Sequence, residues 1–97
     1  MNVLTARIYL TEGEALHQKV ISYLHDEAKV LGTTSYRAIS GFGRSGEMHS
    51  SSLLDLSMDL PIIVEFFDEE EKVRNALDAM KELIPPGHVL TFAAELN

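Results

Sequence analysis

The order of the apolar patterns along the chain constrains its fold more than any other feature. Residues 3–10 alternate between apolar and other side chains, which is typical of a half-buried strand. Apolar residues then recur mostly every three or four positions over 16–31, as in an amphipathic helix, and Gly32 is expected to end that helix. The segment 33–40 is rich in β-branched and aromatic residues and predicts a second strand.

The second half of the chain continues with a strand, a helix and a strand. Residues 60–67 are strongly apolar and predict a largely buried third strand. Asp68 has the features of a helix N-cap, and Glu71 completes a capping box. A second apolar stripe at helical spacing follows, and the Pro-Pro-Gly of residues 85–87 is expected to end it. Residues 88–96 predict the last strand.

The predicted order is therefore β-α-β-β-α-β. This is the order of the ferredoxin-like α+β sandwich, in which a four-stranded antiparallel sheet carries two helices on one face. The 97 residues are expected to form a single domain, 1–97. The connection between the second and third strands includes a long loop at about 44–59, whereas hairpin loops usually have about 2–5 residues. We expect this loop to respond to a ligand, because long loops are often functional.

Composition narrows the classes of partner and the compartment. The chain has 15 acidic residues against 8 lysines and arginines, a net charge of −7, which argues against nucleic acid and anionic membranes as partners. It has no cysteine, so disulfides and thiolate metal sites are excluded. Residues 1–7 lack the pattern of a signal peptide, and no stretch reaches the roughly 18 apolar residues of a membrane span. We expect a cytoplasmic protein without membrane insertion.

Three glycines within residues 41–46 form the most distinctive motif. Gly41, Gly43 and Gly46 match the spacing GxGxxG. A dinucleotide-binding fingerprint requires a helix to begin at these glycines, whereas a polar run and a strand follow here, so that interpretation fails. On spacing alone two interpretations stay open, a flexible hairpin exit and a backbone concavity that binds an anion.

Cationic and aromatic side chains accompany these glycines. Arg37, Arg44 and His49 are candidates to neutralise phosphate groups, and Phe42, which lies between two glycines, is a candidate to stack on a ligand ring. The candidate ligand-binding residues are Arg37, Gly41, Phe42, Gly43, Arg44, Gly46 and His49.

Several short motifs in order also resemble a known family. The chain resembles the PII-like family catalogued as domain of unknown function 190, related in fold to PII signal proteins and to CutA. The resemblance covers nearly the whole chain and rests on residues 36–43, 48–49, 56–64 and 68–73. The family usually has glycine at two positions where this chain has Lys29 and Ala38.

The resemblance implies a regulatory protein without catalytic activity. It implies a homotrimer that binds an adenine nucleotide (ATP, ADP, AMP or cyclic AMP) between subunits, at the base of a mobile loop between the second and third strands. Ligand binding would order the loop, which here spans about 44–59, and so regulate a membrane transporter, ion channel or enzyme. No cofactor is implied as a requirement, and the nucleotide is the effector.

Two further classes compete with this interpretation. A CutA-like protein for divalent-ion tolerance would hold a metal through Glu47, His49 and Asp55, although the histidines of the chain have no metal-binding spacing. A small enzyme of the acylphosphatase kind would need an arginine and an asparagine after the first strand, and residues 11–13 supply neither. The signalling interpretation therefore ranks first and the metal-binding one second.

Overall fold

A computed structural model describes residues 1–11, 14–42, 48–50 and 61–97. Its elements are β1 (Asn2–Leu10), α1 (Glu14–Ser22), the π-helical segment η1 (Tyr23–Ala28), β2 (Gly32–Arg37), β3 (Ser40–Phe42), β4 (Met48–Ser50), β5 (Ile62–Asp68), α2 (Glu70–Ala79) and β6 (Val89–Glu95).

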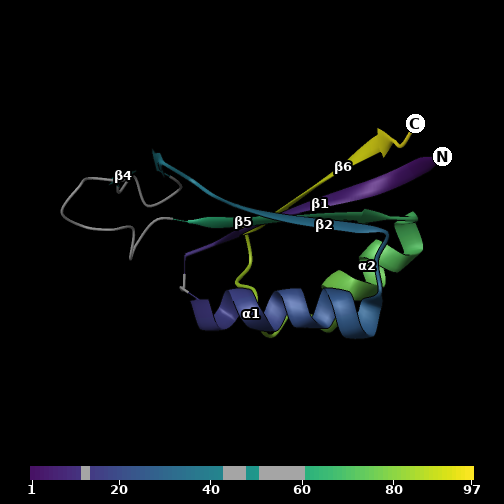
Figure 1. The fold of residues 1–97 in the computed structure, drawn as a ribbon, viewed down its shortest axis with the longest axis horizontal. Coiled ribbons are helices and arrows are strands. Elements are labelled where there is room, and N and C mark those ends of the chain that lie inside the picture. Colours follow the sequence, from purple (N-terminus) through teal and green to yellow (C-terminus); the bar gives the residue numbers. More distant parts are fainter. Residues whose placement is uncertain (12–13, 43–47, 51–60) are drawn as a thin grey trace.

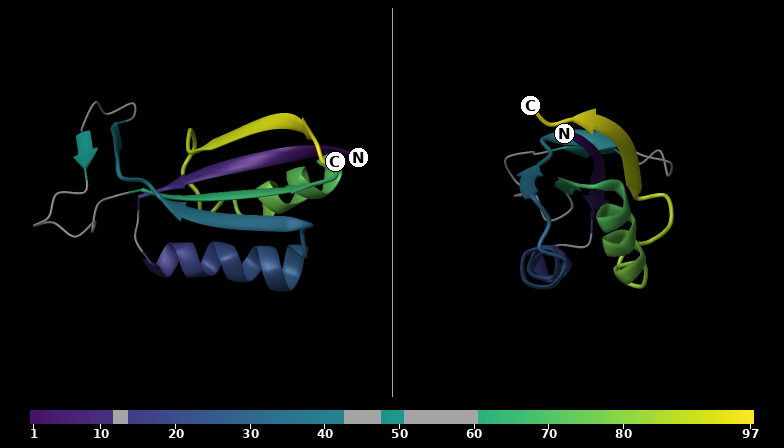
Figure 2. Two further views of the ribbon diagram at one scale, coloured as in Figure 1. Left: turned by 45° about the horizontal axis from the view of Figure 1, so that its top comes forward. Right: turned by 90° about the vertical axis from the view of Figure 1, so that its right-hand side faces the viewer.

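The main sheet has the order β2-β5-β1-β6, and every neighbouring pair in it is antiparallel. Both helices lie on one side of this sheet, side by side beneath the strands (Figure 1 and Figure 2). The ferredoxin-like prediction is therefore confirmed. None of the helices in the described part of the chain is long and apolar enough to span a membrane.

The core lies between the sheet and the two helices. Because side chains alternate along a strand, one face of β1 and one face of β5 point to the helices, and these residues are apolar and buried. The buried cluster consists of Leu4, Ala6, Ile8, Leu10, Val20, Leu24, Ile62, Val64, Phe66, Val73, Ala76, Met80 and Ile84. The helical stripes predicted from the sequence thus supply core residues in both helices, although α2 itself ends at Ala79.

The first helix ends earlier than the sequence predicts. Its C-cap is Lys29, which adopts the left-handed conformation with φ 51° and ψ 51°. The next residue closes the turn, since Val30 N donates to Leu24 O at 3.3 Å. Leu31 therefore lies outside the helix and is 55% exposed. The cap position that favours glycine is filled by a lysine, so the helix ends at a conformational cost.

Gly32 is the first residue of β2 and does not end the helix. It pairs across the sheet with Phe67 of β5. A Cβ atom at Gly32 would lie 2.6 Å from two carbons of the Phe67 ring. The glycine is therefore required by packing, because the aromatic ring occupies the space of the missing side chain.

Asp68 is a buried residue at the end of β5, 5% exposed, and not the N-cap of α2. The N-cap is Glu69, which makes no side-chain cap hydrogen bond. Asp68 Oδ2 accepts from Leu31 N at 3.1 Å, and its Oδ1 accepts from Glu69 N at 2.7 Å. Lys72 Nζ lies 3.3 Å from Asp68 Oδ2 and donates to Lys29 O at 3.0 Å. This carboxylate therefore joins the start of β2 to the start of α2.

Replacement of Gly32 by alanine should destabilise the fold. The new Cβ would displace the Phe67 ring, at a cost of about 1–2 kcal/mol in the free energy of unfolding. Gly41→Ala is the matched control, since a Cβ there meets no atom within 4 Å. Urea denaturation followed by circular dichroism measures both variants. Equal stability of the two variants would contradict the packing role of Gly32.

Replacement of Lys29 by glycine should stabilise the fold. Left-handed backbone costs a non-glycine residue about 1–2 kcal/mol, and the greater flexibility of unfolded glycine offsets part of this gain. We expect a net gain of about 0.5–1 kcal/mol in thermal or urea unfolding. Lys19→Gly, inside α1, should instead cost about 1 kcal/mol. A loss at position 29 as large as at position 19 would refute the assignment.

Candidate functional site

The connection between β2 and β5 leaves and re-enters the sheet at one point. Arg37, the last residue of β2, is paired with Ile62, the first residue of β5. One residue further out, Ala38 N donates to Pro61 O at 3.0 Å. The ladder therefore continues to 38 and 61, so the chain leaves the main sheet after Ala38 and returns to it at Pro61.

Part of this connection forms a small antiparallel ribbon of β3 and β4. Ser40 pairs with Ser50, Gly41 with His49 and Phe42 with Met48. The sequence analysis expected one strand over 33–40 and a loop over 44–59, so both the break after Arg37 and the strand β4 differ from the prediction. The ribbon lies beyond the end of the main sheet (Figure 1).

Four of the predicted ligand-binding residues are described. They are Arg37 at the end of β2 and Gly41, Phe42 and His49 in the ribbon. Arg37 is exposed, and Phe42 is 72% exposed, next to an Ile39 that is 76% exposed. The backbone of His49 lies opposite Gly41 in the ribbon register. Gly43, Arg44 and Gly46 lie outside the described residues, so their predicted role in ligand binding stays a prediction.

The metal-binding alternative requires several histidine or acidic side chains close together. In the described part of the chain, no group of three or more such residues is placed to hold a metal ion. Its proposed ligands Glu47 and Asp55 lie outside that part. His88 has a structural contact, since its Nδ1 lies 2.9 Å from Tyr9 O at the start of the β1–β6 pairing. His25 Nδ1 lies 2.6 Å from Asp26 Oδ1.

The sheet face opposite the helices carries an ion pair at its centre. Arg7 Nε of β1 donates to Glu65 Oε1 of β5 at 2.8 Å, and the Arg7 guanidinium lies 5.1 Å from the centre of the Phe92 ring of β6. The hydrogen bond to Glu65 raises the pKa of Arg7, and a further one to Tyr9 adds to the effect. The cation is therefore fixed on this face by three neighbouring strands.

Apolar and aromatic side chains surround this ion pair. Thr5 is paired with Phe67 and Phe92, Arg7 with Glu65 and Leu90, and Tyr9 with Ile63, which in turn is paired with Tyr36. Residues paired across a sheet point to the same side, so all of them share this face. We call it the open face, since no described helix covers it (Figure 2). The sequence analysis predicted the alternation of residues 3–10 but missed the open face, because the strand register decides which residues of different strands meet.

A known family matches nearly the whole chain. The family model DUF190, described as Uncharacterized ACR, matches residues 2–96. The chain belongs to this family. A relative from Aquifex aeolicus, named UPF0166 protein, is 38% identical over 79 residues, which cover 77% of this chain and 75% of the relative. A relative from Methanocaldococcus jannaschii, also a UPF0166 protein, is 32% identical over 83 residues, covering 80% and 75%.

Solved structures with the same fold include PII-like and CutA proteins. CPII from Thiomonas intermedia K12 bound to ADP and bicarbonate matches with a TM-score of 0.69 and 26% identity, covering 99% of this chain and 87% of CPII. The same protein bound to ADP, AMP and bicarbonate matches with a TM-score of 0.74 and 24% identity, covering 99% and 89%. The divalent cation tolerance protein of Thermus thermophilus reaches a TM-score of 0.61 at 12% identity, covering 99% and 84%. This member of DUF190 therefore has a PII-like fold.

Proposed function

We propose that this chain is a PII-like regulatory protein without catalytic activity. In this proposal it forms a homotrimer in the cytoplasm, binds an adenine nucleotide between subunits, and uses the segment between β2 and β5 to regulate a transporter, channel or enzyme. One observation carries the proposal. The chain shares its fold, over 99% of its length and at 26% identity, with CPII bound to ADP and bicarbonate, and CPII is named a nitrogen regulatory PII-like protein.

The open face supports self-association. It exposes Tyr36, Leu90 and Phe92, which are among the exposed large hydrophobic residues of the described chain. A small chain of 97 residues buries little apolar surface by itself, and an exposed apolar face rimmed by polar groups is typical of a protein interface. In the proposed trimer, neighbouring copies cover this face and remove Arg7 and Glu65 from water. Once buried, the two charges of this pair depend on the hydrogen bond between them. An arrangement of subunits that broke this bond would therefore be disfavoured.

The end of β2 and the ribbon supply the chemistry for a nucleotide. Arg37 offers a planar guanidinium suited to paired hydrogen bonds with a phosphate. Phe42 is exposed and offers a ring for stacking on the adenine. The remaining proposed contacts come from Gly41, Gly43, Arg44, Gly46 and His49. Because the segment leaves the sheet between residues 38 and 61, a ligand held at this base is well placed to change the conformation of the whole segment.

The nucleotide site is tested by calorimetry with ATP, ADP, AMP and cyclic AMP on the assembled protein. We expect at least one of them to bind, and Arg37→Ala to weaken that binding about tenfold or more through loss of a charge-assisted contact. Arg74→Ala is the matched control, since Arg74 is exposed on α2 and pairs with Glu70 at 3.3 Å. Absence of heat with all four nucleotides would refute the nucleotide site.

The trimer is tested by light scattering after gel filtration. The wild-type chain should elute as a trimer, and Arg7→Glu should dissociate it, because the new carboxylate would face Glu65 on a buried surface. Leu90→Asp should do the same, and since Leu90 is 54% exposed this change costs the isolated subunit little. Lys81→Glu, on the exposed turn after α2, should leave the mass unchanged. A monomeric wild type, or trimeric Arg7→Glu and Leu90→Asp variants, would contradict the assembly.

A further inference from the structure

The pairing of β2 with β5 ends at a proline. Ala38 N donates to Pro61 O at 3.0 Å, and Arg37 is paired with Ile62 one step further into the sheet. In an antiparallel ladder, pairs that exchange two backbone hydrogen bonds alternate with pairs that exchange none. The bond from Ala38 therefore marks 38 and 61 as a hydrogen-bonded pair, and the next such pair inside the sheet is Tyr36 with Ile63.

The proline leaves this terminal pair with one of its two bonds. Pro61 has no N–H group, and the alternation of the ladder would have directed that group to Ala38 O. Proline is tolerated at the start of a strand for this reason, and Pro61 comes directly before Ile62, the first residue of β5. The last pair of the ladder is thus weaker than the pairs inside the sheet.

The chain beyond this pair belongs to a different sheet. Continued in the register of β2 and β5, Ser40 would lie opposite position 59, whereas it is paired with Ser50 of β4. Among the described residues, no strand pairing joins β3 or β4 to the main sheet. Ala38 and Ile39 therefore connect two pieces of sheet that are paired independently of each other.

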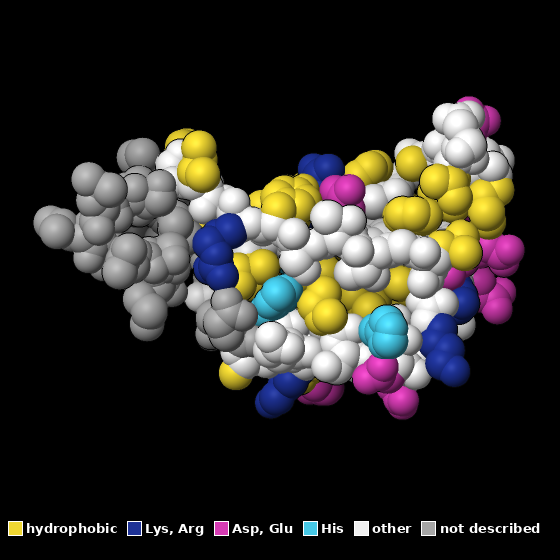
Figure 3. Space-filling view, in the orientation of Figure 1, with side chains coloured by type: hydrophobic (Ala, Val, Ile, Leu, Met, Phe, Trp, Pro, Cys, Tyr) yellow, Lys and Arg dark blue, Asp and Glu magenta, His cyan; other side chains and the backbone are white. Residues whose placement is uncertain are grey.

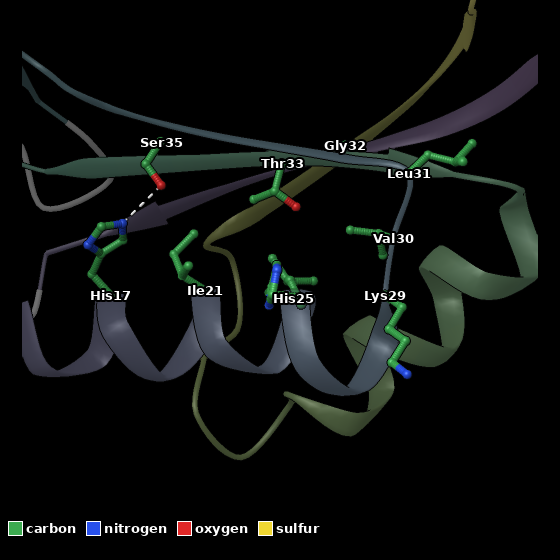
Figure 4. A pocket seen from close by; sticks show the side chains of 10 residues that line it. His17, Ile21, His25, Lys29, Val30, Leu31, Gly32, Thr33 and Ser35 are labelled. Carbon is green, nitrogen blue, oxygen red and sulfur yellow. Dashed lines mark hydrogen bonds between the residues drawn. The ribbon is translucent and has the colours of Figure 1, made fainter.

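The side of this junction that belongs to the main sheet is anchored from two directions. Along one edge, β2 is paired with β5 from Gly32 to Arg37. Along the other edge, α1 and η1 face β2 across a cavity of about 590 Å³, the cavity beside β2 (Figure 4). Here Nε2 of His17 lies 2.9 Å from Ser35 Oγ and ties the helix to the strand. β2 is therefore held in place almost to its last residue.

The other side of the junction is exposed. Ile39 is 76% exposed and Phe42 is 72% exposed. Figure 3 shows apolar side chains on the surface at the end of the molecule that carries the ribbon. Neither residue belongs to the buried cluster between the sheet and the helices. The core of the main sheet therefore does not hold the start of the ribbon.

We propose that Pro61 sets a hinge at Ala38 and Ile39, about which the ribbon of β3 and β4 turns relative to the main sheet. The proline weakens the last pair of the ladder, and core packing does not compensate for the missing bond. Candidate ligand residues lie on both sides of this hinge, with Arg37 in the ladder and Phe42 in the ribbon. A nucleotide that contacts both would span the hinge and fix its angle. The role of the nucleotide rests on the proposed function, whereas the hinge is a property of the ligand-free chain.

Hydrogen exchange of single backbone amides in the ligand-free protein, followed by NMR, tests the hinge. In the wild type, the amide of Tyr36, inside the ladder, should exchange about tenfold or more slowly than that of Ile39. Pro61→Ala restores the missing N–H and should slow exchange at Ala38 by about threefold to tenfold, the effect of one added hydrogen bond. Pro61→Val restores the same group and should act alike. Pro86→Ala is the matched control, since Pro86 is exposed in the turn after α2, and it should leave the rate at Ala38 unchanged.

ADP is the probe that links the hinge to the nucleotide site. At saturation it should slow exchange at Ile39 in the wild type by about threefold or more, and by less in Pro61→Ala, where the hinge is already restrained. The hinge is overturned if both variants at position 61 leave the rate at Ala38 unchanged, or if Pro86→Ala slows it equally. Equal slowing by ADP in the wild type and in Pro61→Ala would overturn the spanning role of the nucleotide. If no nucleotide binds, the proposed function fails, while the ligand-free exchange rates still decide the hinge.

Discussion

The pairing of β1 with both β5 and β6 is the constraint on which the rest of the structure depends. β1 lies inside the sheet and matches seven residues of each neighbour. Its alternation sends Leu4, Ala6, Ile8 and Leu10 into the core beneath the helices and Arg7 and Tyr9 to the opposite side. A shift of one residue would exchange these two sets, so the core and the open face are fixed by the same register.

That register also links the fold to its proposed function. Arg7, Glu65 and Phe92 come from three strands and meet because the strands are aligned, so the ionic centre of the open face exists only in the folded sheet. The pairing of β2 with β5 ends at Arg37 and Ile62 and continues in the hydrogen bond from Ala38 to Pro61. The same sheet thus carries the surface proposed to contact other copies and holds the base of the segment proposed to respond to a ligand.

Much of the fold could be predicted from the sequence, because apolar periodicity reports which face of an element is buried. Val20, Leu24, Val73 and Ile84 were all expected on buried helical faces and are buried. The errors concern positions where tertiary contacts override local preference. Gly32 has the features of a helix stop, yet it accommodates the ring of Phe67, 35 positions along the chain. The ends of the helices show the same limit. Asp68 has the residue type of an N-cap, but it is buried at the end of β5, and its carboxylate oxygens accept hydrogen bonds from Leu31 N and Glu69 N.

For the candidate site, the sequence identified Arg37, Gly41 and Phe42 near one end of the sheet, whereas the open face and the cavity beside β2 require the strand pairing and so were missed. Native mass spectrometry of the protein purified from its own host tests the central claim most directly, since it reports the number of subunits and any retained small molecule together. The account predicts a mass of three chains, with additional mass that matches adenine nucleotides and disappears after denaturation. A single chain without retained ligand, which also stays monomeric when ATP, ADP, AMP or cyclic AMP is added, would contradict it.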